Sequence, residues 1–321
     1  MQRDEIKRED RQHSEEETEA MIELKNLTYR YEAEAVLQDL TTSLSSPKIY
    51  GLMGRNGAGK TTLLALINGY INRGEGSLKV FGENPFDNLS VAVDVSYHGK
   101  PDFKEERNKV EEILGFYRRY RPNFEIDIAK ELLGDFDISL DKTIKKLSQG
   151  KQSALNGILG LASGTPVTLL DEVYVGMDAP SRTRMYRAIL DEQIRRPRLM
   201  ILSTHMVSEM DYLFDHVLIL KNGKLLIDAP VDEVLEKGIA VSGEKSKVED
   251  FTKDLQVLHR EALGPIEKTV VYDEITEEDR KRGLETGLEF EETSLQDLFI
   301  HLTEGTEKVA GKKSMGKEDT K

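Results

Sequence analysis

Two short stretches of the chain carry residue types that bind and cleave phosphates. The first, "GRNGAGKTT", satisfies the pattern G-x-x-x-x-G-K-[ST] and lies between an apolar run and a helical pattern. Gly57 and Gly59 let backbone N–H groups turn inward around phosphate oxygens, which Cβ atoms would obstruct. Lys60 is expected to contact the outer phosphates, and the Thr61 hydroxyl to ligate Mg²⁺. The alternative is a glycine-rich turn with an accidental lysine. The candidate nucleotide-binding residues here are Gly54, Arg55, Asn56, Gly57, Ala58, Gly59, Lys60, Thr61 and Thr62.

The second stretch, "VTLLDE", places two carboxylates after an apolar run. Asp171 is expected at the carboxyl end of a strand beside the glycine loop, where it would hold Mg²⁺ through water. Glu172 is then placed to orient or deprotonate an attacking water, a role typically worth about 10²–10⁴-fold in rate. His205 follows another apolar run, "ILST", and is either a contact to the γ-phosphate or an ordinary histidine at a strand end. The candidate catalytic residues are Glu172, His205 and Lys60.

Alternating strand and helix patterns position these residues. Residues 21–29 and 36–44 have the alternation of short strands in an antiparallel layer. Residues 48–54 predict a buried strand that runs into the glycine loop, and "KTTLLALINGY" predicts the helix after it. Further strands are expected at 77–82, 91–98, 165–172, 198–205 and 216–228, the last with a hairpin turn at Asn222-Gly223. This alternation favours an α/β fold with a largely parallel sheet covered by helices.

Two regions interrupt the alternation and set the expected domains. Residues 100–146 hold two helical patterns without a strand, which indicates a helical insertion. After about residue 240 we expect a small α+β accessory domain, with a helix over 248–263, a strand over 267–275 and a final amphipathic helix over 294–303. The predicted division is a charged disordered arm at 1–20, the main domain at 21–238, the accessory domain at 239–303 and a disordered tail at 304–321.

Composition excludes several functional classes. The formal net charge of the 321 residues is -14, which disfavours a partner nucleic acid held by phosphate neutralisation. The chain has no cysteine, so disulfides and thiolate metal sites are excluded and a reducing compartment is favoured. We expect neither a membrane-spanning helix of about 18 apolar residues nor an N-terminal secretory signal.

The chemical residues, in this order, resemble the nucleotide-binding subunit of an ABC transporter over about residues 21–236. The resemblance implies a P-loop NTPase fold with an ABC-type antiparallel layer and a helical subdomain at about 100–150. It implies that Tyr31, rather than its neighbour Tyr29, stacks on adenine and that Asp178 lies at a dimer interface. His205 matches the family's switch histidine. "LSQGK" matches the signature motif, whose Ser148 and Gly150 would face the γ-phosphate bound to the opposite subunit.

The chain departs from the family pattern at two places. His98 occupies the expected position of the Q-loop glutamine, so it is the third candidate metal contact beside Thr61 and Asp171, or else a satisfied loop histidine. In the signature, Gln149 replaces glycine and Lys151 replaces glutamine. The lysine adds a cation that would favour a phosphate-rich interface, so we expect retained hydrolysis, at an unchanged or a reduced rate.

The family resemblance carries further expectations about cofactors and partners. It implies ATP and Mg²⁺ as cofactors, a second ATPase subunit in a homo- or heterodimer, and a separately encoded transmembrane permease. The ending "EETSLQDLFIHLT" resembles the C-terminal helix of many ABC-2 exporters, which implies export and a position at the cytoplasmic face of the cell membrane. Two alternatives remain open. One is a soluble ABC ATPase that acts on ribosomes or DNA, and the other is an ATP-binding module whose catalysis has decayed.

Overall fold

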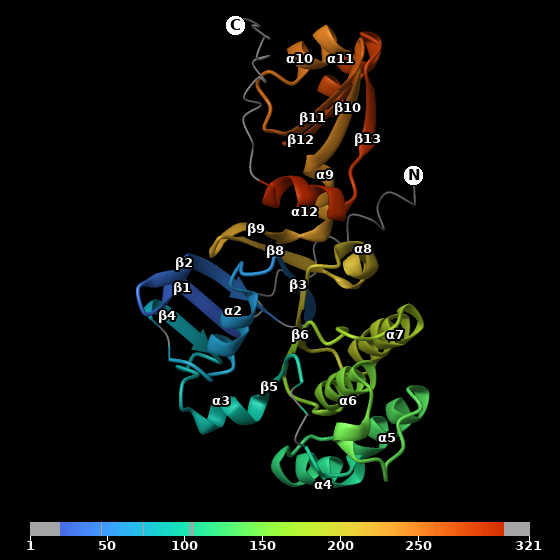
Figure 1. Ribbon diagram of the computed structural model, residues 1–321. Helices are drawn as coiled ribbons and strands as arrows, with labels where there is room; N and C mark the ends of the chain where they lie inside the picture. The colour runs from blue at the N-terminus through green and yellow to red at the C-terminus, as the bar shows by residue number, and fades with distance from the viewer. Residues whose placement is uncertain (1–19, 46, 73, 102, 104–105, 305–321) are drawn as a thin grey trace, which may run out of the picture. The chain divides into compact units, whose positions relative to one another are not determined.

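The protein divides into two compact units. The computed structural model describes residues 20–45, 47–72, 74–101, 103 and 106–304 (Figure 1). The units are Met1–Pro230 and Val231–Lys321, whereas the expected boundary lay at residue 238. The charged segments expected at the two ends lie outside the described residues, except for residues 20 and 304.

An antiparallel three-stranded sheet of order β2-β1-β4 begins the N-terminal unit. Its hairpin closes where Tyr31 pairs with Glu34, and the apolar residues Ile22, Leu24 and Leu27 are fully buried in the core beneath it. The strands are β1 (Ile22–Tyr31), β2 (Glu34–Leu44) and β4 (Glu75–Val80). The antiparallel layer expected from the alternating pattern is confirmed.

A six-stranded sheet of order β5-β6-β7-β3-β8-β9 forms the centre of the same unit. The described strands are parallel except β9, which pairs antiparallel with β8. Asn222 and Gly223 between them have φ angles of 50° and 75°, the left-handed values that a two-residue type I′ hairpin needs. The strands are β3 (Lys48–Gly54), β5 (Val95–His98), β6 (Val167–Asp171), β7 (Leu199–Thr204), β8 (His216–Lys221) and β9 (Lys224–Pro230).

Helices connect the strands of this sheet. The first of them, α2 (Lys60–Ile67), follows directly on the glycine loop after β3. Among the helices drawn in green in Figure 1, α6 is almost wholly buried from Ser153 to Ala162, and its N-cap is Ser148. The green helices are α4 (Val110–Tyr120), α5 (Ile126–Asp135), α6 (Gln149–Ala162) and α7 (Ala179–Arg195). The α/β class and the helical insertion are therefore confirmed.

The strand predicted over 91–98 is half wrong. Residues up to 94 form the helix α3 (Leu89–Asp94), and only Val95–His98 forms a strand. The Asn88 side chain accepts hydrogen bonds from the backbone N–H groups of Ser90 and Val91, so it caps the helix. This N-cap overrides the strand preference of Val91 and Val93.

The C-terminal unit is a four-stranded antiparallel sheet of order β11-β12-β10-β13 with short helices. Its core comprises Ile239, Val241, Val248, Val271 and Leu288. The helix predicted over 248–263 is wrong in its second half, because residues from 257 pair with β12 as a strand. The final helix is confirmed as α12 (Leu295–Thr303), capped by Ser294. The remaining elements are α9 (Val231–Lys237), β10 (Gly238–Glu244), α10 (Lys245–Phe251), β11 (Val257–Leu263), β12 (Ile266–Tyr272), α11 (Glu277–Glu285) and β13 (Glu289–Glu292).

No helix within the described residues is both long enough and apolar enough to cross a membrane.

Candidate functional site

The glycine loop joins β3 to α2. Gly57 and Gly59 have φ angles of 82° and 105°, which L side chains rarely adopt, and Gly59 is the N-cap of α2. A Cβ on Gly59 would lie 2.6 Å from Leu37 Cδ2 and 3.1 Å from the Val36 carbonyl oxygen of β2. The glycine is therefore required by packing as well as by backbone conformation. Arg55, Asn56 and Gly57 are exposed, so the loop is open to an incoming anion.

Lys60 is the first residue of α2, and its buried side chain turns back under the loop. Its Nζ donates a hydrogen bond to the Gly54 carbonyl oxygen at 2.8 Å. The same nitrogen lies 3.6 Å from Glu172 Oε1. The ammonium is thus held at the loop by groups of the protein, in a position from which it can reach a phosphate that the loop binds.

Asp171 ends β6 and is surrounded by hydroxyl groups. Its Oδ2 accepts hydrogen bonds from Thr61 Oγ1 at 2.8 Å and from the Tyr97 hydroxyl at 3.0 Å, while Ser203 Oγ donates to Oδ1. Only 5% of the residue is exposed. Burial, reinforced by the Asp171 carboxylate, raises the pKa of Tyr97, so this phenol remains a donor at neutral pH. The carboxylate is therefore fixed from three elements.

Glu172 and His205 meet at the ends of the adjacent strands β6 and β7. His205 Nδ1 lies 2.8 Å from Glu172 Oε1, and 41% of the histidine side chain is exposed. Glu172 has a φ of 50°, a left-handed conformation that turns the chain sharply after the strand and that costs strain in a non-glycine residue. The structure therefore brings Lys60, Glu172 and His205 into one cluster.

The hydroxyl of Tyr174 contacts His205 and the residue before it. Its hydroxyl lies 3.1 Å from Thr204 Oγ1 and 3.3 Å from His205 Nδ1, and it accepts a hydrogen bond from the His205 backbone N–H. Burial raises the pKa of Tyr174 to about 12. No motif in the sequence indicated Tyr174, although an aromatic residue two positions after Glu172 was a usable signal.

His98 does not join the site. It is buried, its Nδ1 lies 3.2 Å from Asn156 Oδ1 of α6, and burial lowers its pKa to about 4. Successive side chains of a strand point to opposite faces, and Tyr97, the preceding residue, is the one that reaches Asp171. We therefore drop His98 from the candidate metal ligands. Tyr97 is the residue of β5 whose side chain points toward Asp171, and the alternation of side chains along a strand could have indicated this.

Tyr31 lies at the end of β1, and 49% of it is exposed. Its ring packs edge-on against Tyr29, with 5.0 Å between ring centroids. The partner strand of this hairpin, β2, contributes the atoms of Val36 and Leu37 that bound Gly59. The exposed aromatic ring is thus at the end of the strand that pairs with β2, which suits a planar base beside bound phosphates.

Ser148 is the N-cap of α6, and Gly150 lies in the first turn of this helix. Ser148 is exposed, and its hydroxyl accepts a hydrogen bond from the Lys151 backbone N–H as the N-cap. A Cβ on Gly150 would lie 2.5 Å from the Gly176 carbonyl oxygen. The glycine therefore already has a packing role within the subunit, in addition to any approach to a nucleotide.

The Lys151 side chain has a partner within the subunit. Its Nζ donates an exposed hydrogen bond to the Asp137 carbonyl oxygen at 2.5 Å, just beyond the end of α5. Asp178 caps α7, where its Oδ1 accepts from the Ser181 N–H at 2.9 Å.

The groups around Thr61 fit a magnesium ion that is shared with phosphates. Mg²⁺ is usually bound through one or two carboxylates together with substrate phosphates and waters, rather than by an all-protein cage. Thr61 and Asp171 supply one hydroxyl and one carboxylate in direct contact. The described residues contain no group of three histidine or acidic side chains that could hold a metal alone.

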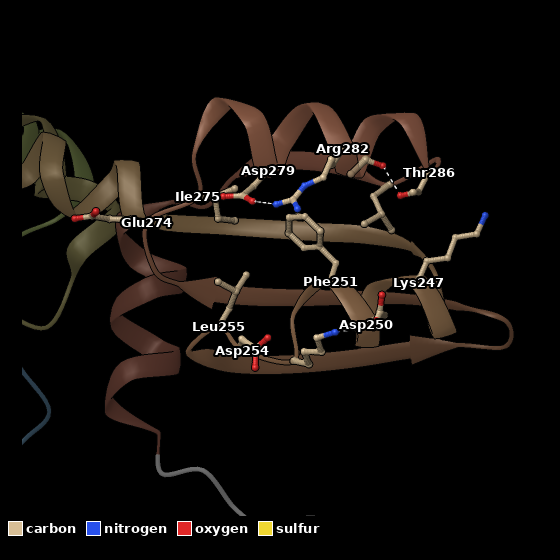
Figure 2. A pocket seen from close by; sticks show the side chains of 13 residues that line it. Lys247, Asp250, Phe251, Asp254, Leu255, Glu274, Ile275, Asp279, Arg282 and Thr286 are labelled. Atoms are coloured by element: carbon tan, nitrogen blue, oxygen red, sulfur yellow. Dashed lines mark hydrogen bonds and ion pairs between the residues drawn. The ribbon is translucent and has the colours of Figure 1, made fainter.

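A cavity of about 450 Å³ lies wholly within the C-terminal unit. Figure 2 shows Phe251, Leu255 and Ile275 among the side chains that line it. Arg282 pairs with Asp279 beside the cavity. Its lining includes none of the phosphate-loop or carboxylate residues described above.

Comparisons with known proteins agree with this geometry. A family model described as "ABC transporter" matches residues 37–175. An uncharacterized ABC transporter ATP-binding protein of Methanocaldococcus jannaschii is 30% identical over 221 residues, which cover 67% of this chain and 80% of that protein. The ABC transporter ATP-binding protein YtrB of Bacillus subtilis is 27% identical over 221 residues, which cover 69% of this chain and 76% of that protein.

A third relative and a solved structure extend the comparison. The bacitracin transport ATP-binding protein BcrA of Bacillus licheniformis is 29% identical over 225 residues, covering 68% of this chain and 72% of that protein. The solved structure of an ATP binding subunit of an ABC transporter has a TM-score of 0.61 at 22% identity and covers 67% of this chain and 91% of that one. The structural likeness shows the shared fold.

Proposed function

The chain belongs to the ABC transporter ATP-binding family, whose members are ATPases, and from this premise we propose that it powers export through a separately encoded transmembrane protein. In this proposal it lies at the cytoplasmic face of the membrane, bound to its partner. The family also includes relatives named for the transport of bacitracin and of manganese, so the name of one relative does not identify the cargo.

The observation that carries the proposal is the cluster at the ends of β3, β6 and β7. Glu172 lies within ion-pair or hydrogen-bond distance of both Lys60 and His205, and Thr61 contacts Asp171. A decayed site would not be expected to retain a phosphate-binding lysine, a general base and a metal-binding pair together.

Each residue then has a defined task. The loop amides and Lys60 bind the phosphates of ATP, and the exposed ring of Tyr31 stacks on adenine. Glu172 orients and deprotonates the attacking water, and His205 holds Glu172 and contacts the γ-phosphate. Thr61 and Asp171 would hold Mg²⁺, which neutralises charge on the outer phosphates.

A second subunit would complete each site. Ser148 and the N-terminus of α6 are exposed on one subunit, and their positive dipole end would face the γ-phosphate that the other subunit holds. Head-to-tail closure of two subunits, identical or related, would move the helical segments with ATP binding, and hydrolysis would reset them.

A surface for the membrane partner is suggested by apolar side chains around α3 and α4. Leu89 is 85% exposed, and Phe116 and Tyr120 are also largely exposed with their ring centroids 4.5 Å apart. Arg121, at the end of α4, donates to the Val93 and Val95 carbonyl oxygens and so joins the two helices. Exposed apolar side chains of this kind suit contact with a helix from a partner protein. The amphipathic helix α12 supports the proposal of an ABC-2 exporter, because its sequence resembles the C-terminal helix of many such exporters.

A turnover assay tests the catalytic part of the proposal. We expect Mg²⁺-dependent phosphate release by the wild type, loss of ATP binding in Lys60→Ala, and retained binding with nearly abolished release in Glu172→Gln. Absence of phosphate release from a dimerising wild-type sample would instead favour the ATP-binding module with decayed catalysis.

Purification from the native cell tests the transport part. An integral membrane protein is expected to co-purify with the Glu172→Gln variant in the presence of ATP. A surface variant that introduces a charge, Leu89→Glu, should lose the partner while it keeps its ATPase activity. Recovery of ribosomes in place of a membrane protein would support the soluble alternative.

A further inference from the structure

Tyr97, like Tyr174, belongs to none of the motifs in the sequence. Tyr97, the third residue of β5 (Val95–His98), directs its hydroxyl at Asp171 Oδ2 over 3.0 Å. That same oxygen also accepts the Thr61 hydroxyl at 2.8 Å. Ser203 holds the other carboxylate oxygen, Oδ1. Tyr97 is therefore the only one of these three donors that reaches the carboxylate from β5.

The surrounding chain leaves a defined space for this hydroxyl. A Cβ on Gly99 would collide with the Tyr97 hydroxyl oxygen, and Gly99 is not in a left-handed conformation that would require glycine by itself. On the other side the Tyr97 ring packs edge-on against Tyr70, with 5.6 Å between ring centroids. The phenol is thus confined by the segment after β5 and by the segment after α2.

A hydrogen bond at this place has a direct consequence for a metal. Groups that donate to a metal-binding carboxylate fix its orientation, and removal of such a group typically weakens metal affinity or activity by about 10–100-fold. Asp171 is nearly fully buried, so bulk water cannot easily replace a lost donor.

We propose that Tyr97 is a positioning residue for Asp171, and that its hydroxyl keeps the carboxylate oriented for the magnesium ion of bound Mg-ATP. The proposal rests on the proposed function, since it concerns the ATP site. The sequence had suggested His98, the next residue of β5, as a metal contact, but its side chain is bonded to Asn156 instead.

The test is the coupling between Mg²⁺ and ATP binding, measured as the dissociation constant of a fluorescent ATP analogue with Mg²⁺ and with EDTA. Tyr97→Phe retains the ring and removes only the hydroxyl. We expect it to weaken binding about 10-fold with Mg²⁺ and to leave binding in EDTA unchanged. Tyr50→Phe is the matched control, because it removes a buried hydroxyl that bonds to Ser45, and its coupling should equal that of the wild type.

Two results would overturn the proposal. One is an unchanged Mg²⁺ coupling in Tyr97→Phe, and the other is an equal loss with Mg²⁺ and with EDTA, which would indicate a general packing role. If Tyr97→Phe does not fold, Gly99→Ala decides, because it displaces the hydroxyl without removing it and should weaken the same coupling. Failure of the wild type to bind the analogue in either condition would refute the proposed function itself.

Discussion

Replacing Gly150 by alanine tests whether this signature glycine is required within the subunit. The added Cβ would lie 2.5 Å from the Gly176 carbonyl oxygen and 3.2 Å from Met177 Cα, both of which are backbone atoms. The first distance is about 1 Å shorter than ordinary van der Waals contact, so α6 or the segment before α7 must shift. Overpacking of this kind costs about 1–3 kcal/mol, against a gain of about 0.5–1 kcal/mol from replacing a helical glycine. We expect a net loss of about 1–2 kcal/mol.

The assay is denaturant unfolding followed by circular dichroism, with and without ATP. Because the chain has two units, the relevant transition is the one that ATP shifts. Gly115→Ala is the control, since a Cβ on this glycine in α4 meets nothing within 4 Å. It should stabilise the chain by about 0.5–1 kcal/mol, so the two variants are expected to move in opposite directions. A Gly150→Ala protein as stable as the wild type would refute the packing argument.

Three further predictions concern single side chains. Glu172→Gln should lower the rate of phosphate release by about 10²–10⁴-fold while the analogue's dissociation constant stays within a few-fold, and single-turnover kinetics that remain fast would contradict the role of Glu172 as the base. Burial lowers the pKa of His98 to about 4 from 6.5, so between these pH values the unfolded chain carries a proton that the folded chain lacks. The free energy of unfolding should therefore fall as the pH decreases through this window, and His98→Gln should flatten the dependence; equal slopes in both proteins would exclude His98 as the cause. Lys151→Gln should lower the free energy of unfolding by no more than about 1 kcal/mol, because it removes one exposed hydrogen bond to the Asp137 carbonyl oxygen, and should change the ATPase rate less than twofold. A larger change in the ATPase rate would indicate that Lys151 contacts the nucleotide at the subunit interface.

The parts of the site that the sequence predicted are those with local requirements. A glycine loop between a strand and a helix, or Asn222-Gly223 between apolar runs, needs only its own backbone angles to form. Asp171 and Glu172 could likewise be placed at the sheet edge, because parallel strands end together. These features depend on a few neighbouring residues, so one sequence suffices to identify them.

The features that the sequence did not predict depend on residues far along the chain, or on which of two neighbouring strand residues faces the site. Residues 257–263 become a strand because they pair with residues of β12, although their own sequence also suits a helix. The exchange of His98 for Tyr97 follows from strand alternation, in which a shift by one residue reverses the face of every side chain. The packing of Gly150 depends on Gly176, far along the chain, and no local pattern contains that information.

The pairing of Glu172 with both Lys60 and His205 makes ATP binding an exchange of anions. The glutamate carboxylate lies 3.6 Å from Lys60 Nζ and 2.8 Å from His205 Nδ1, the two groups that a γ-phosphate would contact in the proposed site. An arriving phosphate must compete for them, and in doing so it releases the carboxylate to accept a proton from water. When inorganic phosphate departs, the carboxylate can recover its former partners. In the proposed cycle, the same two contacts would hold the base away from water before ATP binds and would favour the loss of product after turnover.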